Sequence, residues 1–303
     1  HLNLWYSLIK YTITCRNLGL ILSFLFYFSL TSQAQLIPQW ATMSGGSNND
    51  IGKSVAIDLA SNIYVTGYTS SSFLDFGNDV ILNNSGAYVV KYNSIGEAQW
   101  AQSVGNTTDG HDVDTDQAGN IYVSGVFNKP TVDFGDGVII DHSGDGNNDI
   151  FIVKYDTDGT ALWAKAINGI QEGIDYDSNK RSTSIAVDEQ GNVHLAGSFD
   201  KPYIHFGYKK TTIGGGVLPL GRKEVLLPII IYNNGEDDMF VVKYNSLGEP
   251  QWAESIGGED DDVAKELAVD HEGNVYLAGY SNSATLNAYK VIPEDRRPYG
   301  NAY

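Results

Sequence analysis

The sequence predicts an all-β fold, a β-propeller-type array of about four four-stranded antiparallel blades. Three observations predict it. Three kinds of motif recur in the same order along the chain, the strands that they predict are apolar on both faces, and no window after residue 34 keeps the 3.6-residue period of an amphipathic helix. Antiparallel strands with two apolar faces have to lie between other sheets, as the blades of a propeller do.

The first motif surrounds tryptophan and fixes the length of the unit. After Gln35 every tryptophan stands in a similar context, as in "PQWATMSGG" and "PQWAESIGG". The spacings of 60, 63 and 89 residues indicate a unit of about 60 residues that is expanded in its third copy. A solenoid is the alternative architecture, but its repeats are usually shorter. The units begin near Trp40, Trp100, Trp163 and Trp252.

Each unit is predicted to contain four strands, here called a ("SVAID"), b ("NIYVTG"), c ("YVVKY") and d ("AQWAQS"). An Asp-x-x-Gly-Asn turn joins strands a and b, because Gly accepts a positive φ and Asp and Asn bind nearby backbone. In the first copy Ser61 takes the place of Gly, which should strain that turn slightly. We predict that the aspartate ending each strand a caps its turn, the alternative being a circle of carboxylates around the axis: Asp58, Asp116, Asp188 and Asp270. The strand c lysines are expected to pair with neighbouring carboxylates: Lys91, Lys154 and Lys243.

The connection between strands b and c is the variable part of the unit. A shared Phe-Gly pair and an apolar triplet predict an extra hairpin there, as in "LDFGNDVILNNSG". In the third copy residues 208–228 replace two residues and bring four basic side chains to an acidic chain, which makes this a candidate binding loop. A tolerated insertion is the alternative, because long surface loops cost little stability. The basic residues are Lys209, Lys210, Arg222 and Lys223.

The stretch "DHSGDGNND" is a candidate calcium loop. Oxygen-bearing side chains stand at every second position, and Gly146 permits a sharp turn among them. The bidentate Glu that closes such loops is absent, and a polar hairpin turn is the alternative. The candidate ligands are Asp141, Ser143, Asp145, Asn147 and Asp149.

The order of the motifs resembles the SBBP β-propeller repeats of secreted bacterial proteins, built on "SIAVD-x-x-GN-Y-G…FVVKYN-x-x-G…W". The resemblance covers Trp40 to about Tyr280, and a more distant one connects the strand-turn-strand core to NHL-type propellers. The phased WD dipeptide of WD40 repeats and the Ser-x-Asp-x-Gly-x-x-Trp boxes of sialidases are absent from the sequence. The resemblance implies a propeller fold in a secreted or cell-surface protein, and it implies no particular ligand.

The chain divides into three regions. Residues 1–34 have two basic and no acidic residues, a 13-residue apolar run and small residues before Gln35, which predicts a cleaved signal peptide rather than a spanning anchor. Residues 35–285 hold the repeats, and residues 286–303 fit no repeat. Either the strand of Trp40 closes a fourth blade, or the units are an arc cut from a larger ring. We favour the arc.

Charge and cysteine content restrict the partners. Loss of residues 1–34 would take two of 19 basic residues and none of 37 acidic ones, which changes the formal charge from −18 to −20. Such a surface disfavours nucleic acid and anionic membranes. The single cysteine, Cys15, lies in the predicted signal region, so we expect no disulfide and no thiolate chemistry in the mature chain.

No catalytic residue or cofactor-binding motif is assigned, because the histidines after residue 34 are scattered without metal spacing and no nucleophile or phosphate-loop motif occurs. Calcium is the one cofactor that the sequence indicates. We therefore predict an exported binding or interaction module for an extracellular glycan or protein. A polysaccharide-active hydrolase or lyase and a passive surface spacer are the alternatives.

Overall fold

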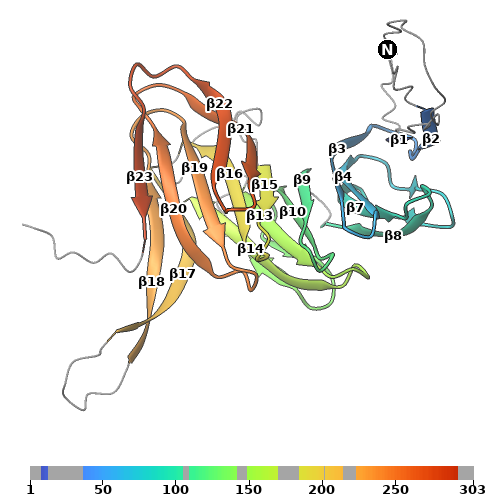
Figure 1. Ribbon diagram of the computed structural model, residues 1–303, viewed down its shortest axis with the longest axis horizontal. Helices are drawn as coiled ribbons and strands as arrows, with labels where there is room; N and C mark the ends of the chain where they lie inside the picture. The colour runs from blue at the N-terminus through green and yellow to red at the C-terminus, as the bar shows by residue number, and fades with distance from the viewer. Residues whose placement is uncertain are drawn as a thin grey trace, which may run out of the picture.

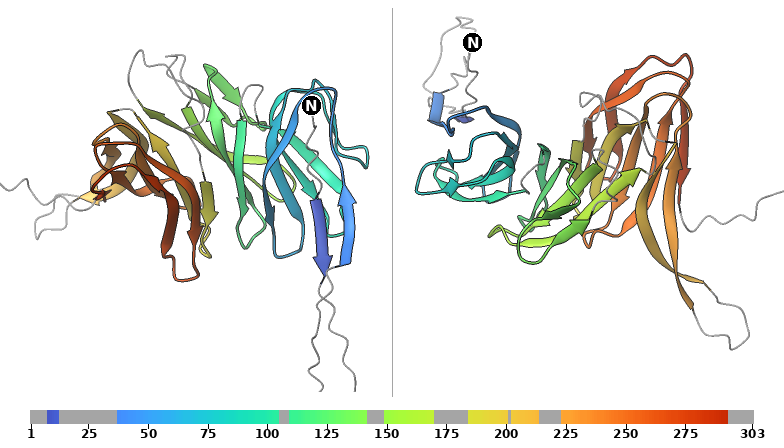
Figure 2. Two further views of the ribbon diagram at one scale, coloured as in Figure 1. Left: turned by 90° about the horizontal axis from the view of Figure 1, so that it is seen from above. Right: turned by 180° about the vertical axis from the view of Figure 1, so that it is seen from behind.

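The computed structural model describes residues 8–12, 37–104, 109–141, 149–169, 184–200, 202–213 and 223–292. These residues form strands and turns without a helix, which confirms the all-β prediction. The main sheets follow one another in chain order, from the sheet of β3, β4, β7 and β8 to the C-terminal strands at the opposite end (Figure 1). The same succession is visible from above and from behind (Figure 2).

The predicted strands a, b, c and d form neighbouring antiparallel strands in three consecutive sheets. The first blade contains β3 (Asp50–Ile57), β4 (Ile63–Thr69), β7 (Gly86–Tyr92) and β8 (Ala98–Ser103). The second contains β9 (Asp109–Thr115), β10 (Ile121–Phe127), β13 (Asp149–Tyr155) and β14 (Ala161–Gly169). The third contains β15 (Ser184–Val187), β16 (Val193–Phe199), β19 (Asp238–Tyr244) and β20 (Pro250–Gly257).

The predicted extra hairpin between strands b and c is present in all three blades. It is short in the first two and long in the third, where β17 also pairs with the edge strand β14 of the second blade. The third hairpin therefore joins two sheets, which the sequence did not indicate. The three hairpins are β5 (Leu74–Asp75) with β6 (Ile81–Leu82), β11 (Thr131–Asp133) with β12 (Ile139–Asp141), and β17 (Tyr203–Ile213) with β18 (Lys223–Tyr232).

The remaining strands lie at the two ends of the array. At one end, β1 (Leu8–Thr12) pairs with β2 (Ile37–Thr42), which carries Trp40. At the other, β21 (Asp262–Val269) pairs with β22 (Val275–Ser281) as strands a and b of a fourth unit, and β23 (Asn287–Val291) adds a fifth strand to the third blade beside β20. Among the described residues β2 pairs with β1, and β21 pairs with β22.

Each predicted Asp turn is present and capped as expected. The backbone N–H of the turn asparagine donates to the aspartate Oδ1 at 2.8–2.9 Å in all four copies. The glycines at the fourth position of the Asp-x-x-Gly-Asn turns have φ between 75° and 83°, and Ser61 adopts φ 64° in their place. Turn capping therefore accounts for the recurring aspartates.

A tryptophan contact repeats between successive units. The indole N–H of Trp40, Trp100 and Trp163 donates to the carbonyl of the second turn residue between strands c and d of the following blade, at 3.1–3.2 Å. The glycine of that turn lies beneath the indole ring; an added Cβ at Gly248 would lie 3.0 Å from Trp163. The acceptor carbonyls belong to Ser94, Thr157 and Ser246.

A second contact repeats between the innermost strands. In each blade the polar side chain four residues before the turn aspartate accepts a hydrogen bond from a backbone N–H of the next blade. The bonds are Val113 N–H to Ser54 Oγ at 3.3 Å, Ile185 N–H to Asp112 Oδ2 at 2.8 Å, and Leu267 N–H to Ser184 Oγ at 3.1 Å. Adjacent blades are thus joined at both their inner and outer strands, as propeller packing requires.

The strand c lysines follow the prediction in two of three copies. Lys154 lies 3.4 Å from Asp116, and Lys243 lies 2.9 Å from Asp188. The prediction for Lys91 is wrong: its Nζ donates to the carbonyl oxygen of Thr157 in the next blade at 2.8 Å. A carbonyl oxygen thus takes one of the three ammonium donors at the position where the other blades place a carboxylate.

Strand b carries a tyrosine that binds the turn aspartate, except in the third blade. The hydroxyls of Tyr64 and Tyr122 donate to Asp58 and Asp116 at 3.0 Å. His194 takes this position in the third blade and lies 3.3 Å from Asp188, with the side chains of both residues 1% exposed. The histidine is thus a core residue at a position where the other units place tyrosine.

Candidate binding site

The structure describes only the two ends of the predicted calcium loop. Asp141 ends β12 and accepts a hydrogen bond from Thr131 at 3.2 Å, and Asp149 begins β13 and is buried. Ser143, Asp145 and Asn147 lie outside the described residues. Across the part of the chain that is described, no three His, Cys, Asp or Glu residues are grouped closely enough to hold a metal ion. The calcium loop stays a prediction.

We expect millimolar Ca²⁺ to raise the melting temperature if this loop binds the ion. An incomplete oxygen set is compatible with dissociation constants of about 10⁻⁴–10⁻³ M, and ligand at ten times its dissociation constant adds about 1.4 kcal/mol of stability. The measurement is a thermal melt in Ca²⁺ and in chelator, with Asp145→Ala alongside. Identical curves in all conditions would leave an ordinary polar turn.

The predicted basic loop lies on the long third hairpin. Lys209 and Lys210 are consecutive residues of β17, and successive side chains of a strand point to opposite faces. Arg222 and the side chain of Lys223 lie outside the described residues. A single basic patch containing all four residues stays a prediction.

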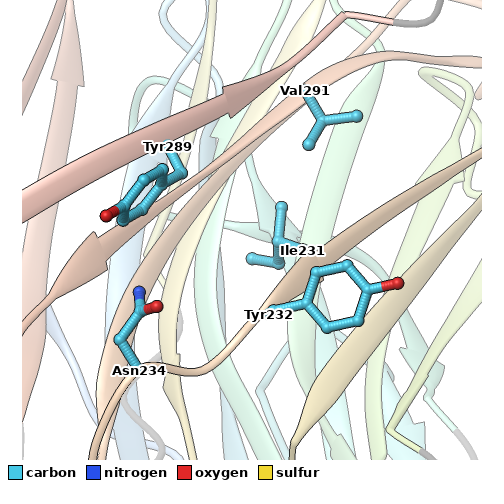
Figure 3. Close-up of a pocket in the computed structure, with 5 residues that line it drawn as sticks. All are labelled: Ile231, Tyr232, Asn234, Tyr289 and Val291. Atoms are coloured by element: carbon cyan, nitrogen blue, oxygen red, sulfur yellow. The ribbon is translucent and has the colours of Figure 1, made fainter. Parts of the chain in front are cut away.

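A pocket of ≈ 250 Å³ lies at the base of the same hairpin, where β18 meets β23. Figure 3 shows the rings of Tyr232 and Tyr289 on either side of Ile231, with Val291 and Asn234 nearby. Ile231 is buried, whereas Tyr232 and Tyr289 are 64% and 55% exposed. The pocket thus combines an apolar floor with two exposed phenol rings and one amide.

Two strand pairings bring these residues together. Tyr232 ends β18, and its ring lies 6.1 Å from that of Tyr203 across the hairpin. Tyr289 lies opposite Ser255 in the β20–β23 pairing, and the Ser255 hydroxyl donates to the Tyr232 carbonyl oxygen at 3.0 Å. The two walls of the pocket are therefore attached to the same strand, β20.

Asp238 fixes the third side of the pocket. Its Oδ2 accepts the Asn234 backbone N–H at 2.9 Å and the Asn234 side-chain amide at 3.3 Å, and it lies 3.3 Å from the Ser255 hydroxyl, whose one hydrogen it shares with the Tyr232 carbonyl oxygen. Burial raises the pKa of Asp238, and the nearby Asp262 charge adds to the rise. One fully buried carboxyl group therefore orders both the amide and the strand behind it.

Little in the sequence indicates this pocket. Its residues come from the stretch that directly follows the insertion, at the end of β18, and from the segment after Leu286, which fits no repeat. Neither a motif nor a periodicity connects the two segments, and only the β20–β23 pairing does so. An unusual density of tyrosine, 19 in the whole chain, was the one available signal.

Comparisons with known proteins agree with the repeat architecture. Residues 39–73 and 251–287 match the SBBP β-propeller repeat family. An uncharacterized WD repeat-containing protein, L264 of Acanthamoeba polyphaga mimivirus, is 27% identical over 84% of this chain and 21% of its own length. The regulatory protein FlaEY of Caulobacter vibrioides is 28% identical over 46% of this chain and 12% of its own. The chain spans about a fifth or less of these relatives.

No helix in the described part of the chain has the length and hydropathy to cross a bilayer. The repeated contacts between blades, the strand order within each sheet and the two family matches point to the same architecture. The chain is an all-β, β-propeller-type repeat protein, and its segments 39–73 and 251–287 match the SBBP repeat family.

Proposed function

We propose that this protein is an exported binding module that holds an extracellular glycan or protein. The observation that carries the proposal is a difference between the recurring and the variable parts of the repeats. The recurring residues are buried or cap turns, whereas the expanded third hairpin supplies Tyr232 to an exposed aromatic pocket. Exposed aromatic side chains on a rigid scaffold favour binding.

Export is part of the proposal and rests on the signal-like residues 1–34. Cleavage before Gln35 would remove β1 and leave β2, whose Trp40 contacts Ser94 without help from β1. The negative charge of the chain supports solubility outside the cell and disfavours nucleic acid as the ligand.

The test uses the intact mature chain. A glycan array and a pull-down with surface proteins from the producing cells would be read together with chromatography of any released oligosaccharide. Retention of a glycan or protein without product release is the expected result. Released oligosaccharides would instead favour a polysaccharide-active enzyme, and retention of neither ligand class would favour a passive spacer.

A further inference from the structure

We propose that the pocket formed by Ile231, Tyr232, Asn234, Tyr289 and Val291 binds one uncharged pyranose ring of a polysaccharide. This inference rests on the proposed binding function and assigns it a site and a ligand class. Three properties of the pocket support it: its size and aromatic walls, the polar groups at its rim, and the absence of charge among the residues that line it.

The size and walls of the pocket suit a single sugar ring. Its volume of ≈ 250 Å³ is below the ~300–1,000 Å³ of pockets for drug-sized ligands. One face of a pyranose carries several C–H groups and packs against an aromatic ring, while its hydroxyls lie at the rim. Tyr232 and Tyr289 supply rings on two sides, with Ile231 between them and Val291 above it (Figure 3).

The polar groups at the rim match hydroxyl groups. Neither Tyr232 nor Tyr289 uses its hydroxyl in a hydrogen bond within the described structure, so both remain available to donate and accept. The amide of Asn234 donates to the buried Asp238, which leaves its carbonyl oxygen to accept from a ligand. Phenol and amide groups together offer donors and acceptors, as an alcohol-rich ligand requires.

The uncharged lining of the pocket and the negative charge of the chain favour binding of a neutral sugar over binding of a uronate. The five residues that line the pocket carry no charge, so none of them would pair with a carboxylate. Lys290 points to the other face of β23, where its Nζ lies 4.0 Å from the centre of the Trp252 ring. The chain as a whole has a formal charge of −18, which repels polyanions.

The experiment measures retention of the full chain in native gels that contain soluble polysaccharides. Neutral glucans, mannans and xylans are compared with alginate and polygalacturonate. We expect retention by at least one neutral polymer and none by the uronates. Tyr232→Ala and Tyr289→Ala should each weaken binding about tenfold, which corresponds to about 1.4 kcal/mol. Tyr232→Phe should lose less than Tyr232→Ala, because it keeps the ring.

Tyr208→Ala is the matched control. Tyr208 lies on β17 outside the pocket and is 55% exposed, and its substitution should leave retention within twofold. Because all three tyrosines are exposed, the variants should fold, and circular dichroism checks this. Uronate binding as tight as neutral binding, or equal losses in Tyr208→Ala and Tyr289→Ala, would overturn the inference. Capture of a protein ligand with no retention by neutral polymers would overturn it while leaving the proposed function intact.

Discussion

Replacing Trp163 by alanine should lower the free energy of unfolding by about 3 kcal/mol, near the lower end of the range for buried aromatic residues. The indole is partly buried against the core shared by the second and third blades. It also donates to Ser246 of the third blade at 3.2 Å and covers Gly248. Alanine would remove the packing, the hydrogen bond and the cover over the turn. Trp100→Ala should behave alike, because its indole donates to Thr157 at 3.1 Å.

Urea titration measures the effect as a shift in the unfolding midpoint. Trp163→Phe separates the contributions: it keeps most of the packing and should lose only about 1 kcal/mol through the hydrogen bond. Leu162→Ala is the control on the same strand, since Leu162 is 47% exposed and should change stability by less than about 0.5 kcal/mol. A loss under ~1 kcal/mol for Trp163→Ala would mean that the indole does not seal the blade interface.

The features predicted from sequence are those that local chemistry determines. The Asp-x-x-Gly-Asn turns form because one aspartate binds the backbone four residues on, and glycine adopts the positive φ. In the first two blades the turns at Phe-Gly form in a similar way, because Gly77 and Gly135 have a positive φ and donate their backbone N–H to Asp75 and Asp133. Repetition then extends each local inference over the whole array, so the strand order within a blade was also predictable.

The features that sequence did not indicate depend on contacts between distant and unrepeated segments. The pairing of β17 with β14 joins the insertion to another blade through Asn168 opposite His205 and Gly169 opposite Ile204. Backbone pairing of this kind leaves no side-chain signature. Lys91 was assigned a carboxylate because Lys154 and Lys243 have one, yet in the first blade a backbone carbonyl replaces it. A repeat pattern predicts the contacts that all copies share, but it does not show where one copy uses a different partner.

Histidine in place of tyrosine at position 194 should make the third blade sensitive to acid. Burial, followed by the charge of Lys243, lowers the pKa of His194 to about 4, although Asp188 acts in the opposite direction. The charge of Lys290 also disfavours protonation of the ring, and Trp252 lies edge-on at 6.0 Å. The Nδ1 atom is buried and has no hydrogen-bond partner, so no acceptor is ready for a second ring proton.

We expect the free energy of unfolding to fall by roughly 2–3 kcal/mol between pH 7 and pH 4.5 through this one residue. The unfolded state takes up a proton near pH 6.5 and the folded state only near pH 4, so the unfolded state binds more protons in this window. The stability that the neutral ring provides is therefore complete above pH 6.5 and is lost as the pH falls. Hydrogen bonds from Asn192 and Lys243 outweigh burial and hold the pKa of Asp188 at about 2, so its contribution is lost only at lower pH.

Urea titration at a series of pH values tests this in wild type and in His194→Tyr. Tyrosine should bind Asp188 as Tyr64 binds Asp58, and the acid loss should disappear. The difference between the two proteins isolates the histidine, because Asp114, Asp238 and Glu266, whose pKa values burial raises, titrate in both. His194→Phe removes the same titratable group and serves as a second variant in case tyrosine does not fit the site. His271 has a side chain that is 77% exposed, so His271→Gln should show the same acid response as wild type. Equal acid losses in wild type, His194→Tyr and His194→Phe would show that the buried ring does not control the response.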